Sequence, residues 1–456
     1  MGESMKQIIH KPTFIIAAMT CFCFLLTSTG WLAWEYHLME QVSPRMSDIM
    51  TMVFSYLLQA GGVGLFAVLL RTKGLFAVKL VPSAMILHTL CLIPAVLSRN
   101  LSGTLVSGFL VSLFCGYIAG YYLYVLTRKI EARRRATTLG IGYGVSILLS
   151  WLLSAFDGLY YSNKVWVICL ILTAITLLLF KRTETLPATE FTKAQQKEEP
   201  GKLRALLWSV GAMVLLFSIV NNLGFAFSAA DIVHGIKTEL SRLFYAWGLI
   251  LAGVLADRER KYGAAAALVS LIIPFIMLAL RNEPLSLTVF WALSYFTYGF
   301  LSIFRMVVFS DLAEKRGLWF LSGFGLLIGR IGDAAGESTF LALTSSQIAL
   351  VFLSTLLFLT AGFLFFRVFN SLYVPEAKQR QSEKEYFYAF AAQHDLSARE
   401  QDMLRLLLNK KSNTEIAEAL SISENTVKFH IRNLLQKTGF KNRNELITAY
   451  LSRFGI

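Results

Sequence analysis

Charged side chains are scarce in this chain. Aspartate, glutamate, lysine and arginine make up 16% of the 456 residues, whereas 55% of the residues are hydrophobic. Soluble globular domains carry about 25% charged residues, so this composition excludes a chain built only of such domains. Most of the side chains must face lipid or one another.

Cysteine is also rare, and no catalytic motif is recognisable. The five cysteines lie inside apolar runs, and none has metal-site spacing apart from the close pair Cys21 and Cys23. We therefore interpret them as packing residues. The sequence contains no nucleophile elbow, phosphate loop, zinc spacing or kinase signature, so we predict no enzymatic activity, no metal and no cofactor.

Long apolar runs, by contrast, are abundant. A bilayer core about 30 Å thick requires about twenty apolar residues per helix, and this criterion predicts twelve spans. The first run lacks a convincing cleavage site, so we interpret it as a spanning helix and not as a removable signal. The spans are predicted near residues 13–34, 48–70, 74–97, 102–126, 137–156, 164–180, 205–227, 240–256, 263–280, 285–308, 318–341 and 347–369.

Positive charge is concentrated in alternate breaks between these spans. Residues 128–135 after the fourth span and 258–261 after the eighth are rich in arginine and lysine, while other breaks hold single cations such as Arg45, Arg99 and Arg281. Because cytoplasmic loops are enriched in lysine and arginine, we expect both termini to be cytoplasmic. We therefore predict a multi-pass protein of the inner cell membrane.

The membrane part, residues 1–369, divides into two halves. A charged linker at 181–204 separates six spans at about 12–180 from six at about 205–369. Residues 253–261 read GVLADRERK, which resembles the loop signature of the major facilitator superfamily of transporters. This resemblance implies an all-α twelve-helix bundle with two related halves, but the corresponding loop RTKG at 71–74 has no aspartate.

Three ionisable residues interrupt the eleventh span. Arg330, Asp333 and Glu337 are three and four residues apart, so they lie along one face of a helix, and their exposure to lipid would be costly. Two alternatives stay open. The group forms either a central site for a ligand, ion or coupling step, or an internal ion pair, such as Arg330 with Asp333, that joins neighbouring helices.

Other polar residues of the membrane part favour structural roles. Arg305 is interpreted as a side chain that extends to the membrane interface from the cytoplasmic end of the tenth span. Asn221, Asn222 and His88 are interpreted mainly as helix-packing residues, although each is also suited to line a cavity.

The last sixty or so residues are polar and carry clear helix start signals. A connector at 370–393 is expected to be a cytoplasmic tether, partly helical. Helices at about 413–420 and 424–438 are separated by three residues, which is helix-turn-helix spacing. Capping boxes are predicted at Ser397 with Glu400, Ser412 with Glu415 and Asn442 with Glu445, and Ser423 is a fourth N-cap, so four short helices are expected.

The third of these helices has two different faces. Its apolar stripe, predicted to be buried, consists of Val427, Ile431, Leu434 and Leu435. The outer face and its flanks carry amides, cations and one apolar ring, which suit base edges, phosphates and a thymine methyl group. The predicted DNA contacts are Thr426, Lys428, Phe429, Arg432, Asn433 and Lys437. His430 is interpreted as a residue at the edge of the core.

Residues 394–456, with the run SNTEIAEALSISENTVKFHIRNLLQKTGFKNRNEL, resemble the LuxR-type (GerE-like) helix-turn-helix domain along its full length. The resemblance implies binding to double-stranded DNA as a homodimer. Lys410, where the family usually has glycine, and Thr414, where it often has a cation, depart from the pattern.

These observations together predict a membrane-embedded transcription regulator. Its partners are DNA, membrane lipid and a small molecule that the membrane domain senses. The alternatives are a facilitator-type solute transporter with a DNA-binding tail, and a passive membrane anchor that carries a regulator.

Overall fold

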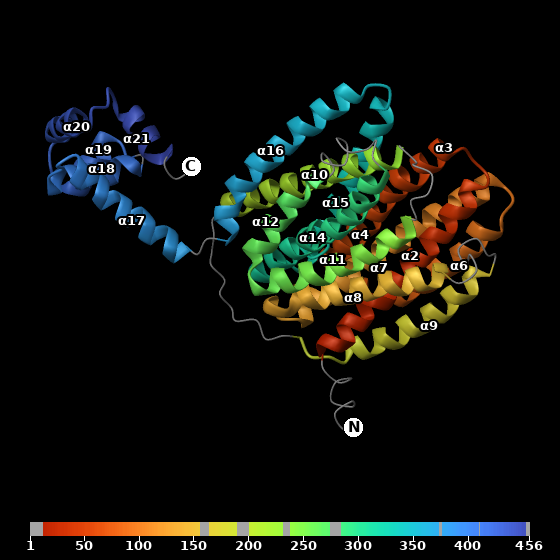
Figure 1. Cartoon of the computed structure of the whole chain (residues 1–456). Helices are drawn as coiled ribbons and strands as arrows, with labels where there is room; N and C mark the ends of the chain where they lie inside the picture. Colours follow the sequence, from red (N-terminus) through yellow and green to blue (C-terminus); the bar gives the residue numbers. More distant parts are fainter. Residues whose placement is uncertain are drawn as a thin grey trace. The chain divides into compact units, whose positions relative to one another are not determined.

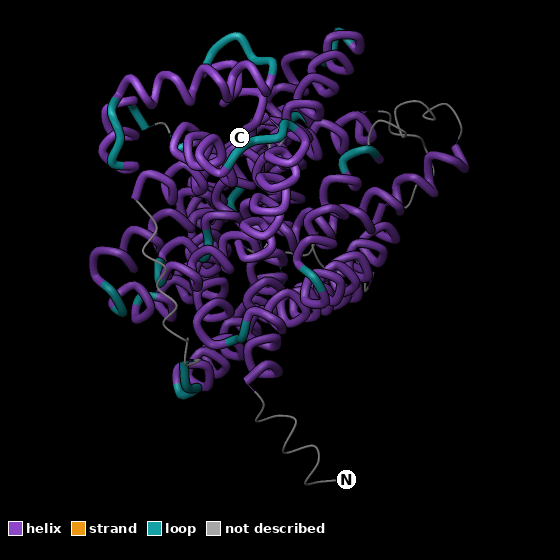
Figure 2. The backbone as a smooth tube through the Cα atoms, turned by 90° about the vertical axis from the view of Figure 1, so that its left-hand side faces the viewer, coloured by secondary structure: helices purple, strands orange, loops and turns teal. Residues whose placement is uncertain are grey.

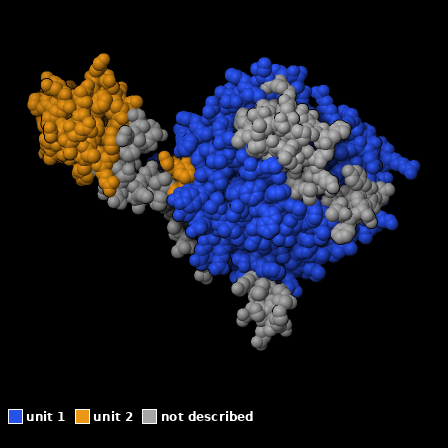
Figure 3. Space-filling model, in the orientation of Figure 1, with its two compact units in different colours: residues 1–368 blue, residues 369–456 orange. Residues whose placement is uncertain are grey.

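The computed structural model describes residues 12–155, 164–188, 200–230, 238–273, 284–373, 376–409 and 411–452. All regular secondary structure in these ranges is helical (Figures 1 and 2). Helices satisfy their own backbone hydrogen bonds, as lipid requires, and the all-α prediction is confirmed. The chain forms two compact units, residues 1–368 and 369–456 (Figure 3).

The first half of the membrane unit begins with one long helix and a helix of mixed type. The helical run from Pro44 to Lys73 contains a π-helical segment, η1, of six residues. This length is unusual, because most π-helices are single turns inserted in an α-helix, often at functional sites. The elements are α2 (Pro12–Met39), α3 (Pro44–Asp48), η1 (Ile49–Phe54), α4 (Ser55–Lys73), α5 (Phe76–Lys79), α6 (Val81–Leu97), α7 (Leu101–Lys129), α8 (Ala132–Ala155) and α9 (Val165–Glu184).

The second half follows the predicted linker, of which residues 189–199 lie outside the described residues. Its elements are α10 (Pro200–Ala230), α11 (Thr238–Arg258), α12 (Arg260–Ser270), α14 (Pro284–Arg316), η3 (Trp319–Leu321), α15 (Phe324–Leu343) and α16 (Gln347–Tyr373).

Nine helices within the described ranges are long and apolar enough to cross a membrane. The predicted spans at 240–256, 263–280 and 318–341 are not among these nine. Residues 274–283 are outside the described part of the chain, and the side chains of α11 are described only from residue 243. Helix α15 contains the three ionisable residues. The count of twelve spans therefore stays a prediction.

Helix pairs pack in a corresponding way in both halves. Helix α4 packs on α7, as α11 packs on α14, and α2 packs on α8, as α10 packs on α15. Glycine permits the closest crossings: a Cβ on Gly116 would lie 1.9 Å from the carbonyl oxygen of Gln59, and one on Gly248 would lie 1.9 Å from that of Phe296. The halves also contact each other, through α8 with α11 and α4 with α15.

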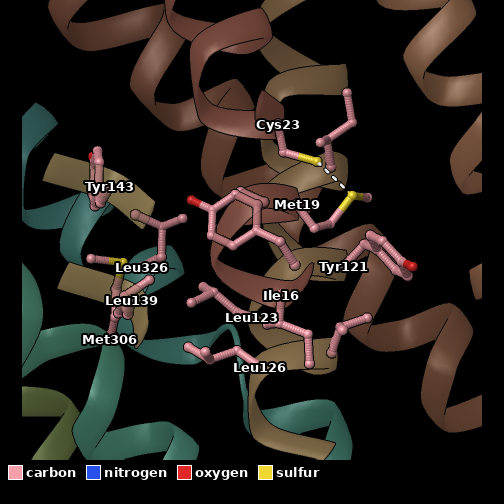
Figure 4. Packing of buried hydrophobic residues seen from close by; sticks show 14 of the residues in the cluster. Ile16, Met19, Cys23, Tyr121, Leu123, Leu126, Leu139, Tyr143, Met306 and Leu326 are labelled. Carbon is pink, nitrogen blue, oxygen red and sulfur yellow. Dashed lines mark hydrogen bonds between the residues drawn. The ribbon is translucent and has the colours of Figure 1, made fainter. Parts of the chain in front are cut away.

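One hydrophobic cluster joins the two halves. Buried side chains of the first half, such as Met19, Leu139 and Tyr143, share it with Met306 and Leu326 of the second (Figure 4). The cysteines described as buried, including Cys23 in this cluster, are free thiols. Their interpretation as packing residues fits these positions.

The second unit consists of α17 (Glu376–Gln393), α18 (Ala398–Leu408), α19 (Asn413–Leu420), α20 (Glu424–Thr438) and α21 (Arg443–Ser452). The expected tether is thus helical over most of its length. Phe387 and Phe390 of α17, each 7% exposed, belong to the same hydrophobic cluster as Leu404, Ile416 and Leu434 of the following helices. The core of this unit therefore begins before residue 394.

The predicted helix starts agree with the structure. Complete capping boxes are formed by Ser397 with Glu400 and by Ser412 with Glu415. At the last helix, Asn442 accepts a hydrogen bond from the backbone N–H of Glu445 at 2.9 Å, but the Glu445 carboxylate accepts from the N–H of Lys441 and not from that of Asn442.

Candidate functional site

Helix α20 follows α19 after a three-residue turn. Ser421 adopts the left-handed conformation with φ 51°, and Ser423 caps α20 by accepting a hydrogen bond from the Thr426 N–H at 3.2 Å. The Thr414 hydroxyl of α19 donates to the Glu424 carboxylate at 2.6 Å. Thr414 therefore links the two helices, while Lys410, the other departure from the family pattern, lies outside the described residues.

One face of α20 is open to solvent. Phe429 is 53% exposed. Lys428 and Arg432 are also exposed and make no ion pair or side-chain hydrogen bond among the residues that the structure describes. Asn425 and Gln436 are exposed on the same face, because these positions lie within about 100° of one another on a helical projection. The opposite face contributes Val427 and Leu434 to the core, as predicted.

The other predicted DNA contacts, on the flanks of this face, are less exposed or already hydrogen-bonded within the domain. Thr426 and Asn433 are half-buried, and His430 is half-buried with its ring 5.6 Å from that of Phe429. The ammonium group of Lys437 contacts the Glu400 carboxylate at 2.7 Å and the Asp395 carbonyl oxygen at 2.8 Å. Two of its three N–H donors are thus engaged within the domain.

The Glu400 carboxylate is nearly buried, with 5% of its side chain exposed. Burial by itself raises its pKa, but the hydrogen bonds from Lys437 and from the backbone N–H of Ser397 outweigh burial and lower the pKa below its usual value. Glu400 therefore joins the start of α18 to the end of α20 as an anion.

The membrane unit contains a cavity of about 520 Å³ between its two halves. Its described lining comes from α2, α3, η1, α4, α7 and α8 of the first half and from α10, α11, α14 and α15 of the second. The wall is rich in aromatic rings and includes six tyrosines: Tyr56, Tyr122, Tyr143, Tyr245, Tyr295 and Tyr298.

The ionisable residues of α15 are only partly brought together. Arg330 and Glu337 line the cavity, whereas Asp333 is 2% exposed and lies outside the lining. The Arg330 guanidinium lies 3.5 Å from the Asp333 carboxylate and 4.3 Å from the centre of the Tyr56 ring. The predicted Arg330–Asp333 pair therefore exists, but it is long.

The principal partner of Asp333 is Arg305. One guanidinium nitrogen of Arg305 lies 3.1 Å from each carboxylate oxygen of Asp333, and Arg305 is 2% exposed. The predicted extension of Arg305 to the membrane interface is wrong. Helix α14 continues to Arg316, eight residues beyond the predicted span end, so Arg305 lies well inside the helix, where only another side chain can compensate its charge.

Amide side chains also reach the cavity. Asn221 and Asn222 line it, and Asn222 donates to the Glu337 carboxylate at 3.1 Å. His88, in contrast, is fully buried between helices beside Gly30, which agrees with its interpretation as a packing residue. Tyr56 and Asp48 also line the cavity but were not predicted, because Tyr56 is one of 17 tyrosines in the chain and Asp48 stands alone at the start of an apolar run.

The loop segment GVLADRERK forms an ionic junction between the halves. The Asp257 carboxylate accepts hydrogen bonds from the backbone N–H groups of Ala136 and Thr137, in the first turns of α8, at 3.0 and 2.6 Å, a favourable place for an anion. Arg260 and Arg135 both contact Asp311 of α14. In the loop that lacks the aspartate, Arg71 instead lies 5.2 Å from the ring of Phe320.

Comparison with known proteins identifies the second unit. Residues 394–450 match the family model "Bacterial regulatory proteins, luxR family". The spore germination protein GerE of Bacillus subtilis (strain 168) is 43% identical over 56 residues, which are 12% of this chain and 76% of GerE. The chain belongs to the luxR family. Its exposed α20 face is thus the face of a luxR-family helix-turn-helix domain.

Longer luxR-family relatives share only this domain. The regulatory protein YhcZ of Bacillus subtilis (strain 168) is 46% identical over 67 residues, covering 15% of this chain and 28% of YhcZ. The nitrate/nitrite response regulator NarP of Escherichia coli (strain K12) is 43% identical over 70 residues, covering 14% of this chain and 33% of NarP. The chain therefore spans a third or less of the length of these two relatives.

The membrane unit of this luxR-family protein has a solved structural neighbour. The crystal structure of the human organic anion transporter MFSD10 (TETRAN) aligns with a TM-score of 0.56 at 14% identity and covers 79% of this chain and 99% of the transporter. This likeness shows the fold, a facilitator-like helical bundle, and agrees with the resemblance in the loop segment.

Proposed function

We propose that this luxR-family protein is a membrane-embedded transcription regulator whose membrane unit senses a small molecule. The observation that carries the proposal is the union, in one chain, of a helix-turn-helix domain with an open basic face and a membrane unit with a polar, aromatic cavity. In this proposal twelve helices cross the inner membrane, and both termini are cytoplasmic.

The DNA contacts follow from the exposed side chains of α20. Arg432 and Lys428 bind base edges or phosphates in the major groove, and Phe429 contacts a thymine methyl group. Thr426 and Asn433 flank this face, and Lys437 has one donor left for a phosphate. Two copies bind as a homodimer, as the resemblance to the family implies.

Sensing requires that the ligand bind two states of the membrane unit with different affinities. The cavity is lined by both halves, so its shape depends on how the halves meet. We assign transmission to α17, because its second half packs in the core of the DNA-binding unit and because it follows the last membrane helix in the chain.

The first experiment is genome-wide DNA occupancy of the full chain in its own host, beside a version without residues 396–456 and a version with Arg432→Ala. Discrete peaks that disappear with the deletion and weaken with the substitution are expected. Peaks that persist in the deletion would contradict the proposed regulator. So would a full chain that gives no peaks, both with and without added extracts of the host's growth medium.

A second candidate function is solute transport with an accessory regulatory tail. The ionic junction at Asp257 and the facilitator-like fold favour it. Uptake of a labelled solute by the reconstituted full chain, lost in a variant with a blocked cavity, would support transport.

A passive-anchor role makes a different prediction. Regulation of the target genes should then be unchanged after all spans are replaced by one unrelated membrane helix.

A further inference from the structure

Two arginines share the Asp333 carboxylate unequally beside the cavity. Arg305 and Asp333 form a close pair that is excluded from solvent, with both carboxylate oxygens at 3.1 Å from one nitrogen. Arg330 shares the same carboxylate only at 3.5 Å. Asp333 is therefore paired mainly with Arg305, and Arg330, at the cavity wall, has only a long contact to a carboxylate.

The hydrogen-bonding capacity of Arg330 is largely unused. A guanidinium group has five N–H donors, and within the described residues Arg330 has one long contact, while its Nε has no partner. Its plane is positioned by the Tyr56 ring, whose centre is 4.3 Å away. A mostly buried cation with free donors is a strong site for an anion, since charged groups removed from water are costly when unpaired.

The shape of the carboxylate makes it the best anionic partner. Two parallel N–H donors of a guanidinium match two carboxylate oxygens. Phosphate dianions would need further cations, but the other residues with a carboxylate or a basic group in the described lining are Asp48 and Glu337. No ion pair joins either of them to a cation among the described residues, so a second negative charge on the ligand would be repelled.

The rest of the wall suits a flat aromatic body. Trp31 and Tyr56 stack with ring centres 6.0 Å apart, and Tyr245 and Tyr298 stack at 5.2 Å with an interplanar angle of 18°. All four rings line the cavity, and aromatic pairs in such offset arrangements are favourable. The volume of about 520 Å³ is within the range of small-molecule sites.

We propose that the cavity binds a small aromatic monocarboxylate, with its carboxylate on Arg330 and its ring against the aromatic side chains. This inference rests on the proposed sensing function and names the ligand class of that same site. Arg330 provides the charge selectivity, and Asp48 and Glu337 exclude acids with a second carboxylate.

The test is calorimetric titration of the purified full chain in lipid nanodiscs. The probes are phenylacetate, 4-hydroxyphenylacetate and indole-3-acetate, each beside its neutral amide, and 1,4-phenylenediacetate as the diacid. At least one monoacid is expected to bind at least about tenfold more tightly than its amide, because charge-assisted hydrogen bonds are lost in the amide. The diacid is expected to bind more weakly than phenylacetate.

Arg330→Gln is expected to raise the dissociation constant of the bound acid at least about tenfold, and Arg330→Lys to raise it less. The matched control is Arg71→Gln, at an exposed arginine outside the cavity, which is expected to leave binding unchanged. Because Arg330→Gln could misfold, each variant is compared with the parent by thermal unfolding, and the acid-against-amide comparison in the parent stands without any variant.

The ligand class is overturned if the amides bind as tightly as the acids, if folded Arg330→Gln binds the acid as the parent does, or if no monoacid binds at 10 mM. Failure of the regulator function is distinguishable. It would remove DNA occupancy in the host while acid binding to the purified chain persists.

Discussion

Replacement of Phe390 by alanine tests whether α17 is part of the DNA-binding unit. Phe390 is 7% exposed, and its ring lies 5.3 Å from Tyr450 of α21 and 4.6 Å from His394. Buried phenylalanine-to-alanine changes cost about 3–5 kcal/mol, because apolar burial is lost and a cavity remains. A core of this size supplies only about 3–5 kcal/mol in total, so the variant should be largely unfolded at 25 °C.

The assay is urea unfolding of the soluble fragment 376–456, followed by circular dichroism. The matched control is Phe429→Ala, since Phe429 is 53% exposed on the α20 face and its loss should change stability by less than about 0.5 kcal/mol. A fragment of residues 394–456 should be destabilised like Phe390→Ala. Equal urea midpoints for the two fragments, or for Phe390→Ala and the parent, would refute the inclusion of α17 in this core.

Five further substitutions test the two units. Lys428→Ala and Arg432→Ala should each weaken operator binding by about 1–3 kcal/mol, measured by fluorescence anisotropy on the 376–456 fragment; unchanged affinity would refute the assignment of the DNA-binding face. The lowered pKa of Glu400 stabilises the fold above its unfolded pKa of about 4.3, and this stabilisation is lost as the pH falls through the folded pKa. Glu400→Gln should therefore flatten the decline of thermal stability that sets in below about pH 5. An unaltered pH profile of thermal stability would contradict this role of Glu400. Asp333→Asn should destabilise the membrane unit by about 3–5 kcal/mol, seen as a lower unfolding temperature in detergent, whereas the half-buried Glu337→Gln should have a smaller effect; equal effects would argue against the buried pair.

Local sequence signals predicted the second unit well. Ser397, Ser412 and Ser423 cap their helices where expected, because a cap depends on a few adjacent residues and a short range of hydrogen bonds. The exposed face of α20 likewise follows from helical periodicity alone. The contribution of α17 was not predicted, because Phe387 and Phe390 stand in a polar segment and their burial depends on Tyr450, sixty residues further along the chain.

The membrane unit shows the same limit. Apolar length predicted most helices, and the spacing of Arg330, Asp333 and Glu337 left two alternatives open, a ligand site or an internal ion pair. The sequence could not show that Arg305 is the closer partner of Asp333, since the two residues are brought together only by the packing of α14 on α15. The cavity wall was not predictable for the same reason: its rings come from separate helices of both halves.

The helical form of α17 limits how far the DNA-binding unit can search. Between the end of α16 at Tyr373 and the start of α17 at Glu376 there are two residues, which extend over at most about 7 Å. The 18 residues of α17 measure about 27 Å, and the second half of this helix packs in the core of the DNA-binding unit. If the chain is the membrane-embedded regulator proposed above, its operator comes within a few nanometres of the bilayer. Target choice then depends on which chromosomal loci visit the membrane as well as on their base sequence.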